Sequence, residues 1–153
     1  MIKDTQKTHT ELAALADVSP VDILARTLYG EARGEDLAGI EAVACVIMNR
    51  VALAQCRGGY WWGNDVVQVC LKAGQFSCWN KGDPNREKLL RVSERDQAYR
   101  LCRRVANRAI GGKLADAVQG ATHYHTLQCD PWWARGHVPV CEIGNHVFYG
   151  DIG

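Results

Sequence analysis

The stretch "DLAGIEAVACVIMNRV", residues 36–51, carries the strongest periodic signal in the chain. Its apolar residues recur at helical spacing: Ile40, Val43, Ala44, Ile47, Met48 and Val51. Asp36 suits the position before a helix, because its carboxylate can accept hydrogen bonds from the free N–H groups of the first turn. The stretch therefore predicts a helix whose apolar stripe lies in the core.

An earlier helix is predicted to begin at Ser19 and Pro20, residue types that suit the cap and the first helical position. Its apolar residues again follow helical spacing: Val21, Leu24, Ala25 and Leu28. Gly30 follows this pattern directly, and glycine commonly ends helices. We therefore expect the helix to end near Gly30, with the side chain of Glu31 pointing across the junction.

The last third of the chain has a different pattern. A further helix is expected to open at residues 93–96 and to end at Gly111 and Gly112. Residues 121–126, "ATHYHT", are typical of a strand, and Gly144 and Asn145 join two strand-like runs as a two-residue hairpin turn. The sequence predicts one mainly helical α+β domain over residues 19–153, with a small antiparallel sheet in its C-terminal third. Residues 1–18 are expected to be an N-terminal extension, flexible in part.

Composition sets limits on partners and location. The chain has 153 residues and a net charge of +1, which gives no general reason to expect nucleic-acid binding. The first residues lack the apolar segment of a secretion signal, and no run is expected to reach transmembrane length. We therefore expect a monomer that is made in the cytoplasm and does not insert into a membrane. The seven cysteines are then expected to be mostly free thiols.

Two carboxylates, Glu31 and Glu35, flank the expected end of the first helix. A carboxylic acid that is partly surrounded by aromatic side chains could stay protonated near neutral pH and act as a general acid. Alternatively, these acids are surface groups that pair with Arg26 and Arg33. The pattern alone leaves both interpretations open.

Several aromatic residues fall in or beside loops that also contain glycine and amide side chains: Tyr60, Trp61, Trp62, Phe76, Trp79, Trp132 and Trp133. Flat rings flanked by amides suit carbohydrates, whose C–H faces stack while their hydroxyls form hydrogen bonds. Each ring could equally fill the core of a small domain.

A metal site is a further alternative. The histidines and cysteines of the C-terminal third gather within a short stretch: His123, His125, Cys129, His137, Cys141 and His146. Zinc needs three or four converging nitrogen or sulfur ligands, but these spacings match no standard zinc pattern. We therefore expect no metal and no other cofactor.

Four segments together resemble the catalytic domain of the spore-cortex-lytic and cell-wall hydrolase family. They are "ARTLYGEARGEDLAGIEAVACVIMNRV" (25–51), "VVQVCLKAGQFSCWN" (66–80), "ATHYHT" (121–126) and "WARGHVPVCEIGNHVFY" (133–149). The resemblance covers about residues 20 to 149, with its motifs in the same order. It implies a lysozyme-like fold that cleaves the bond between N-acetylmuramic acid and N-acetylglucosamine in peptidoglycan strands.

The resemblance also assigns roles. The catalytic acid of the family corresponds to Glu31, which would be sufficient as a single acid and base in a lytic transglycosylase, whereas the two-carboxylate scheme needs a second acid. Glu35 and Arg33 are expected to be supporting residues. The substrate groove is expected to contain Phe76, Ser77, Trp79, Tyr124, His125, His146 and Phe148.

Relatives of the cortex-lytic type usually carry a secretion signal and often a wall-binding domain, and neither is found in this sequence. We therefore expect an enzyme that reaches the wall after release from the cytoplasm, as a bacteriophage endolysin does. Two other functions remain as alternatives. One is a zinc amidase that uses the C-terminal His/Cys cluster, and the other is a glycan-binding module without catalysis.

Overall fold

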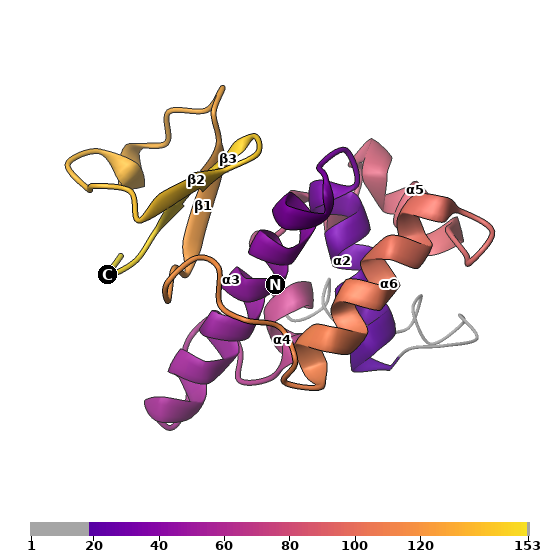
Figure 1. Cartoon of the computed structure of the whole chain (residues 1–153), viewed down its shortest axis with the longest axis horizontal. Coiled ribbons are helices and arrows are strands. Elements are labelled where there is room, and N and C mark those ends of the chain that lie inside the picture. Colours follow the sequence, from indigo (N-terminus) through magenta and orange to yellow (C-terminus); the bar gives the residue numbers. More distant parts are fainter. Residues whose placement is uncertain (1–18, 153) are drawn as a thin grey trace.

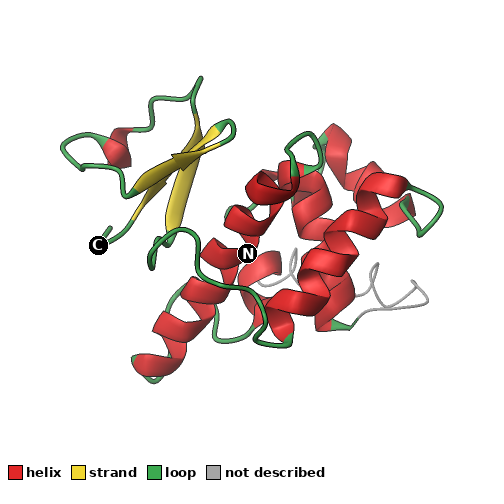
Figure 2. Ribbon diagram, in the orientation of Figure 1, coloured by secondary structure: helices red, strands yellow, loops and turns green. Residues whose placement is uncertain are grey.

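The computed structural model describes residues 19–152, and the predicted extension 1–18 lies outside the described residues. The helices gather into one body and a three-stranded sheet lies beside it (Figures 1 and 2). The helices are α2 (Pro20–Ala32), α3 (Leu37–Cys56), α4 (Val66–Leu71), α5 (Pro84–Arg91) and α6 (Gln97–Ile110), with short 3-10 turns η1 (Ser77–Trp79) and η2 (Trp132–Ala134). The strands are β1 (His123–Thr126), β2 (Cys141–Ile143) and β3 (His146–Tyr149). The predicted α+β class is confirmed.

Local capping explains where the helices begin. The side chain of Ser19 accepts a hydrogen bond from the backbone N–H of Asp22, and that of Asp36 accepts one from Gly39. Asp65, Asp83 and Asp96 cap α4, α5 and α6 in the same way. Such caps satisfy N–H groups that have no partner within the helix. The predicted starts of α2, α3 and α6 are confirmed.

Helix α3 is buried on two sides. One side packs against the other helices through residues such as Ile40, Val43 and Ile47. The other packs against the sheet through Ala42 and Val46, which share a cluster with Phe148 of β3. Figure 1 shows α3 between the sheet and the remaining helices.

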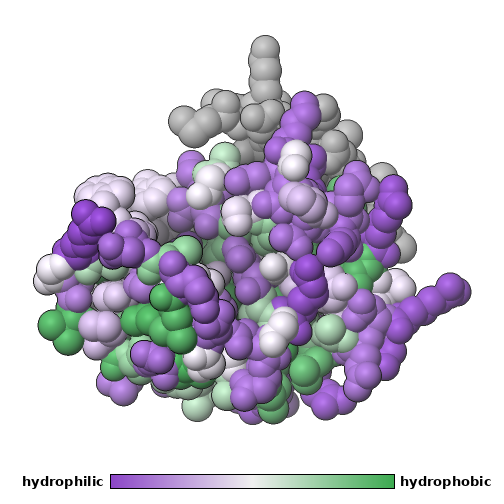
Figure 3. Space-filling model, turned by 90° about the horizontal axis from the view of Figure 1, so that it is seen from above, coloured by the Kyte–Doolittle hydropathy of each residue, from purple (hydrophilic) through white to green (hydrophobic). Residues whose placement is uncertain are grey.

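A helix enclosed in this way is apolar nearly all round. Contrary to our expectation, α3 with its 20 residues has the length and composition of a membrane span. However, 61% of its apolar 18-residue window is buried inside the protein, as in the core helix of a globular domain. The molecular face drawn in Figure 3 is mostly hydrophilic, with apolar side chains in small separate patches.

The expectation that α2 ends near Gly30 is wrong, because the helix continues to Ala32. Gly30 serves close packing instead. A Cβ at this position would lie 2.7 Å from Cβ and Sγ of Cys78 and 2.9 Å from Cδ2 of Leu89. Glu31 consequently sits within the last turn of α2, and the helix backbone fixes its direction.

Helix α5 was not expected from the apolar pattern. It has a single buried residue, Leu89, so its sequence carries almost no helical periodicity. Its signals are instead the Asp83 cap and Pro84 at the first helical position. The short helix covers the end of α2, where Leu89 packs against the Gly30 turn.

The sheet has the order β1-β3-β2, with both pairings antiparallel. Gly144 and Asn145 form the predicted turn between β2 and β3. Because successive residues of a strand point to opposite faces, Tyr124 and Phe148 lie on the face toward α3. His125 and Tyr149 lie on the other face, against Trp133 of the η2 segment.

Candidate active site

The side chain of Glu31 is mostly buried at the end of α2, among groups from several elements. The pKa of its carboxyl is raised from 4.5 to about 7, chiefly because burial removes water from the charged form. The carboxylate of Asp83 adds to this rise, and the guanidinium of Arg50 opposes it. A carboxyl group with such a pKa is protonated for a substantial fraction of the time at neutral pH, as a general acid requires.

The arginines that could have neutralised Glu31 are engaged elsewhere. Arg26 pairs with Asp22 at 2.9 Å, and its Nη1 donates hydrogen bonds to the backbone carbonyls of Leu89 and Val92. Arg33 donates to the side chain of Asn85 at 2.8 Å and lies over the ring of Tyr29. The interpretation of Glu31 as a surface acid paired with these arginines therefore has no support in the structure.

Arg50 is a buried cation on α3 and an electrostatic neighbour of Glu31. Its Nε donates to the backbone carbonyl of Thr122 at 2.7 Å, and its Nη1 donates to Gln75 Oε1 at 3.2 Å. The guanidinium also lies over the rings of Trp62 and Phe76, at 5.5 and 5.3 Å from their centroids. Burial lowers the pKa of Arg50 from its very high usual value, but a guanidinium stays charged in proteins.

Tyr124 brings the sheet to this site. Its ring packs against His146 and Phe148, with centroid separations of 5.0 and 5.8 Å. Burial raises the pKa of the Tyr124 phenol well above its usual value, and the negative charge of Glu31 raises it further. The phenol is therefore a neutral group that can donate a hydrogen bond near Glu31.

Glu35 joins the segment after α2 to the hairpin turn of the sheet. Its Oε1 accepts a hydrogen bond of 3.0 Å from the backbone N–H of Asn145. The same oxygen lies 3.2 Å from Nδ1 of His146. This contact is not a hydrogen bond, and Nδ1 has no hydrogen-bond partner among the described residues. Gly144 allows the contact, since a Cβ there would lie 2.9 Å from Oε2 of Glu35.

Glu35 thus holds the β2–β3 turn against the helical body. Its predicted supporting role in catalysis stays a prediction. Burial lowers the pKa of His146, and the Glu35 carboxylate opposes that shift.

The residues of the η1 segment that were predicted to line the groove differ in exposure. Ser77 is exposed, whereas Phe76 and Trp79 are almost fully buried. The indole N–H of Trp79 donates to Thr27 Oγ1 at 3.0 Å. Phe76 packs against the guanidinium of Arg50, and Trp79 bonds to α2 through Thr27. Their predicted contact with substrate stays a prediction.

The predicted groove residues of the sheet divide between its two faces. Tyr124, His146 and Phe148 share the face toward α3, with His146 and Phe148 buried. His125 lies on the opposite face, where its Nε2 is 2.9 Å from the hydroxyl of Tyr149. The structure does not bring His125 together with Tyr124.

Sequence reasoning missed Arg50 and Asp83. A signal for Arg50 was present, because it lies seven residues after Val43 and thus on the apolar stripe of α3. A charge on such a stripe indicates a buried, partnered group. No comparable signal marked Asp83. Its residue type fits the cap position before α5 but does not indicate that it lies near Glu31.

The histidines and cysteines of the C-terminal third do not form a metal centre in residues 19–152, where no three His, Cys, Asp or Glu side chains converge. His123 and His125 lie among Trp62, Trp133 and Tyr149. Burial and the nearby Arg50 lower the pKa of His123 to about 4. The zinc amidase hypothesis therefore has no site in the described part of the chain.

Comparisons with known proteins identify the family and the fold. The profile of a family described as cell wall hydrolase matches residues 34–149. The match begins three residues after Glu31, so it does not itself include that residue. Among curated proteins no sequence relative is found.

Two solved structures share the fold. The catalytic domain of the SleB protein of Bacillus cereus is 24% identical, with a TM-score of 0.66 over 89% of this chain and 94% of that one. The catalytic domain of SleB from Bacillus anthracis, described as a germination-specific lytic transglycosylase, is 23% identical, with a TM-score of 0.66 over 90% of this chain and 98% of that one. At these identities the likeness establishes the fold.

Proposed function

Because the chain belongs to the cell wall hydrolase family, we propose that it cleaves the bond between N-acetylmuramic acid and N-acetylglucosamine in bacterial peptidoglycan, with Glu31 as the acid and base. The observation that carries this proposal is the Glu31 carboxyl itself. It is desolvated, its pKa is raised to about 7, and neighbouring Arg26 and Arg33 are bound to other groups.

The first step uses the protonated form. Glu31 donates its proton to the glycosidic oxygen while the bond from this oxygen to C1 of the muramic acid breaks. The sugar then carries positive charge at C1, and Glu31 is left as a carboxylate. Arg50 stabilises this carboxylate, since it is the nearby cation that favours the ionised form.

The second step uses the ionised form. Glu31 accepts a proton from the 6-hydroxyl of the same sugar as that oxygen bonds to C1, which closes an anhydro ring and restores the acid. If water takes the place of the 6-hydroxyl, the same proton transfer gives hydrolysis and a reducing end. We propose that the Tyr124 phenol, kept neutral by burial, donates a hydrogen bond to the substrate.

The test is digestion of purified peptidoglycan by the unchanged protein and by Glu31→Gln, with mass spectrometry of the fragments. We expect anhydro-muramic ends from the unchanged protein and none from Glu31→Gln. Glu41→Gln is the matched control, because it alters a carboxylate on α3 that faces Arg108 outside the site. Full activity of Glu31→Gln would overturn the assignment, and reducing ends would identify a hydrolase instead.

A further inference from the structure

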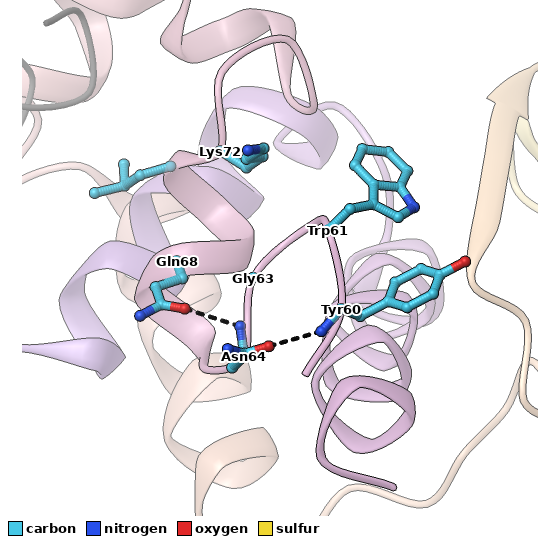
Figure 4. A pocket seen from close by; sticks show the side chains of 7 residues that line it. Tyr60, Trp61, Gly63, Asn64, Gln68 and Lys72 are labelled. Atoms are coloured by element: carbon cyan, nitrogen blue, oxygen red, sulfur yellow. Dashed lines mark hydrogen bonds between the residues drawn. The ribbon is translucent and has the colours of Figure 1, made fainter. Parts of the chain in front are cut away.

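A cavity of about 310 Å³ lies between the loop of residues 57–64 and helix α4. Figure 4 shows the loop on one side, with Tyr60, Trp61 and Gly63, and α4 on the other, with Gln68. Asn64, Leu71 and Lys72 complete the lining. This volume is near the lower end of the range for small-molecule sites, roughly 300–1,000 Å³.

The loop is fixed in place without a ligand. Gly63 has a φ of +112°, and a Cβ there would lie 2.8 Å from Cβ of Gln68, so only glycine lets the loop rest directly on α4. Next to it, Trp62 is buried and its indole N–H donates to the carbonyl of Arg50 at 3.0 Å. The loop is thereby held to both α4 and α3.

Trp61 is 57% exposed on this fixed loop. Its neighbour Trp62 is buried and supplies the contact with the core, whereas Trp61 has ring contacts only with Tyr60 and Trp62 among the aromatic residues of the described chain. A large aromatic ring held rigidly at the edge of a cavity loses little conformational entropy when a flat apolar surface stacks on it.

The polar groups of the cavity are mainly donors. The side-chain oxygen of Asn64 accepts from the N–H of Tyr60, and that of Gln68 accepts from the N–H of Asn64, both at 2.9 Å (Figure 4). These contacts leave the two amide –NH₂ groups without an acceptor among residues 19–152. The ammonium of Lys72 adds further donors. Figure 4 shows the amide of Gln68 on the side of α4 away from the Trp61 ring, whereas Lys72 lies nearer that ring. Trp61 and Lys72 therefore offer an apolar face and a hydrogen-bond donor to one ligand.

We propose that this cavity binds one N-acetylated amino sugar of a glycan strand, at a position beyond the bond that Glu31 cleaves. The C–H face of the pyranose ring stacks on Trp61, and the acetamido carbonyl or a ring hydroxyl accepts a hydrogen bond from the ammonium of Lys72. The choice of sugar rests on the proposed function. The loop that carries Trp61 also reaches the neighbourhood of Glu31. The ring of Trp62 in this loop lies 5.5 Å from the guanidinium of Arg50, which is an electrostatic neighbour of Glu31.

The test uses the Glu31→Gln protein, so that ligand is not consumed. The N-acetylglucosamine tetramer is added during ¹⁵N NMR, which resolves tryptophan indole and side-chain amide signals. We expect saturable shifts of the indole signal of Trp61 and of the backbone signal of Lys72. Trp61→Ala in the same background is expected to weaken binding by about tenfold or more, because the variant lacks the ring on which the sugar stacks.

Trp132→Ala is the matched control. Trp132 is 81% exposed on η2 and is not part of the cavity, so its removal is expected to leave the affinity unchanged. Retained signals of buried residues will show that each variant is folded. The proposal is overturned if Trp61→Ala binds as tightly as its parent, or if the shifts are confined to residues outside the cavity.

The two proposals fail in different ways. Cleavage of peptidoglycan by the unchanged protein, without shifts at Trp61, removes the sugar site and leaves the proposed function standing. Shifts at Trp61 in a protein that cleaves no wall material support the sugar site and remove the proposed function.

Discussion

The helical body and the three-stranded sheet contribute to the Glu31 site in different ways. The body supplies the groups that carry charge, with Glu31 on α2, Arg50 on α3 and Asp83 before α5. The sheet supplies neutral and aromatic cover, chiefly Tyr124, and is held to the body partly by Glu35. One region thus provides the carboxyl that we propose as the acid and base, and the other places an aromatic side chain near it.

This division has a consequence for the pKa of Glu31. Desolvation is the largest cause of its rise, and Tyr124 of the sheet and Cys78 of η1 lie close enough to Glu31 to be affected by its charge. The chemistry of a residue in the helical body should therefore respond to changes in the sheet. The predictions below test this dependence.

The largest expected effect is on activity in Glu31→Gln. Loss of the acid and base should lower the rate of peptidoglycan cleavage by roughly 10²- to 10⁴-fold, while the fold is retained. Turbidity loss of a wall suspension gives the rate, and Glu41→Gln should behave like the unchanged protein. A similar rate in both variants would move the catalytic role away from α2.

Replacement of Arg50 should affect both stability and pH dependence. Arg50→Met leaves the carbonyl of Thr122 without its donor, which should cost about 1–3 kcal/mol of unfolding free energy. Because Arg50 lowers the pKa of Glu31, its loss should raise that pKa, so the fall in activity on the alkaline side should move to higher pH. Arg108→Met alters only an exposed pair at 3.7 Å and should do neither. An alkaline limb that does not move would exclude the coupling.

The raised pKa of Glu31 should also make stability depend on pH. Below about pH 4.5 the carboxyl is protonated in both the folded and the unfolded state and costs nothing. Between 4.5 and about 7 the unfolded chain ionises first, so stability falls as pH rises. The loss reaches at most about 3 kcal/mol above pH 7, at roughly 1.4 kcal/mol for each pKa unit.

Urea unfolding measures this effect. The unfolding free energies of the unchanged protein and of Glu31→Gln should differ little near pH 4.5. The variant should become the more stable of the two as the pH passes 7. A difference that is constant across this range would show that Glu31 has an ordinary pKa.

The difference between the two regions also explains what could be read from the sequence. The caps at Ser19, Asp36 and Asp96 act within one turn, so the starts of the helices were predictable. The hairpin turn at Gly144 and Asn145 was predictable for the same reason. These features need no knowledge of distant contacts.

The features that could not be predicted depend on packing between distant segments. Gly30 was expected to end α2, yet its role is set by Cys78, 48 residues later. The second buried side of α3 exists only because the sheet folds back onto it. Glu31 itself was one of two similar acids on pattern alone, and the family resemblance was what singled it out.

Gly30→Ala tests the packing explanation. In an exposed helix this change would stabilise by roughly 0.5–1 kcal/mol, but here the added Cβ meets Cys78 and Leu89 at 2.7–2.9 Å. Overpacking of this kind costs about 1–3 kcal/mol, so we expect a net loss and a lower melting temperature. Gly34→Ala is the control, because no atom lies within 4 Å of its Cβ position. Equal melting temperatures would contradict the packing role of Gly30.

The smallest expected effect is in Glu35→Ala. The change removes the acceptor for the Asn145 N–H and should cost about 1 kcal/mol, so hydrogen exchange should speed up in residues 141–149. Water should then reach Glu31 more easily, which lowers its pKa and moves the alkaline fall in activity to lower pH. Glu142→Ala, on the exposed side of β2, should change neither measurement. Faster exchange without a change in the pH profile would mean that Glu35 holds the hairpin but that the hairpin does not shield the Glu31 carboxyl from water.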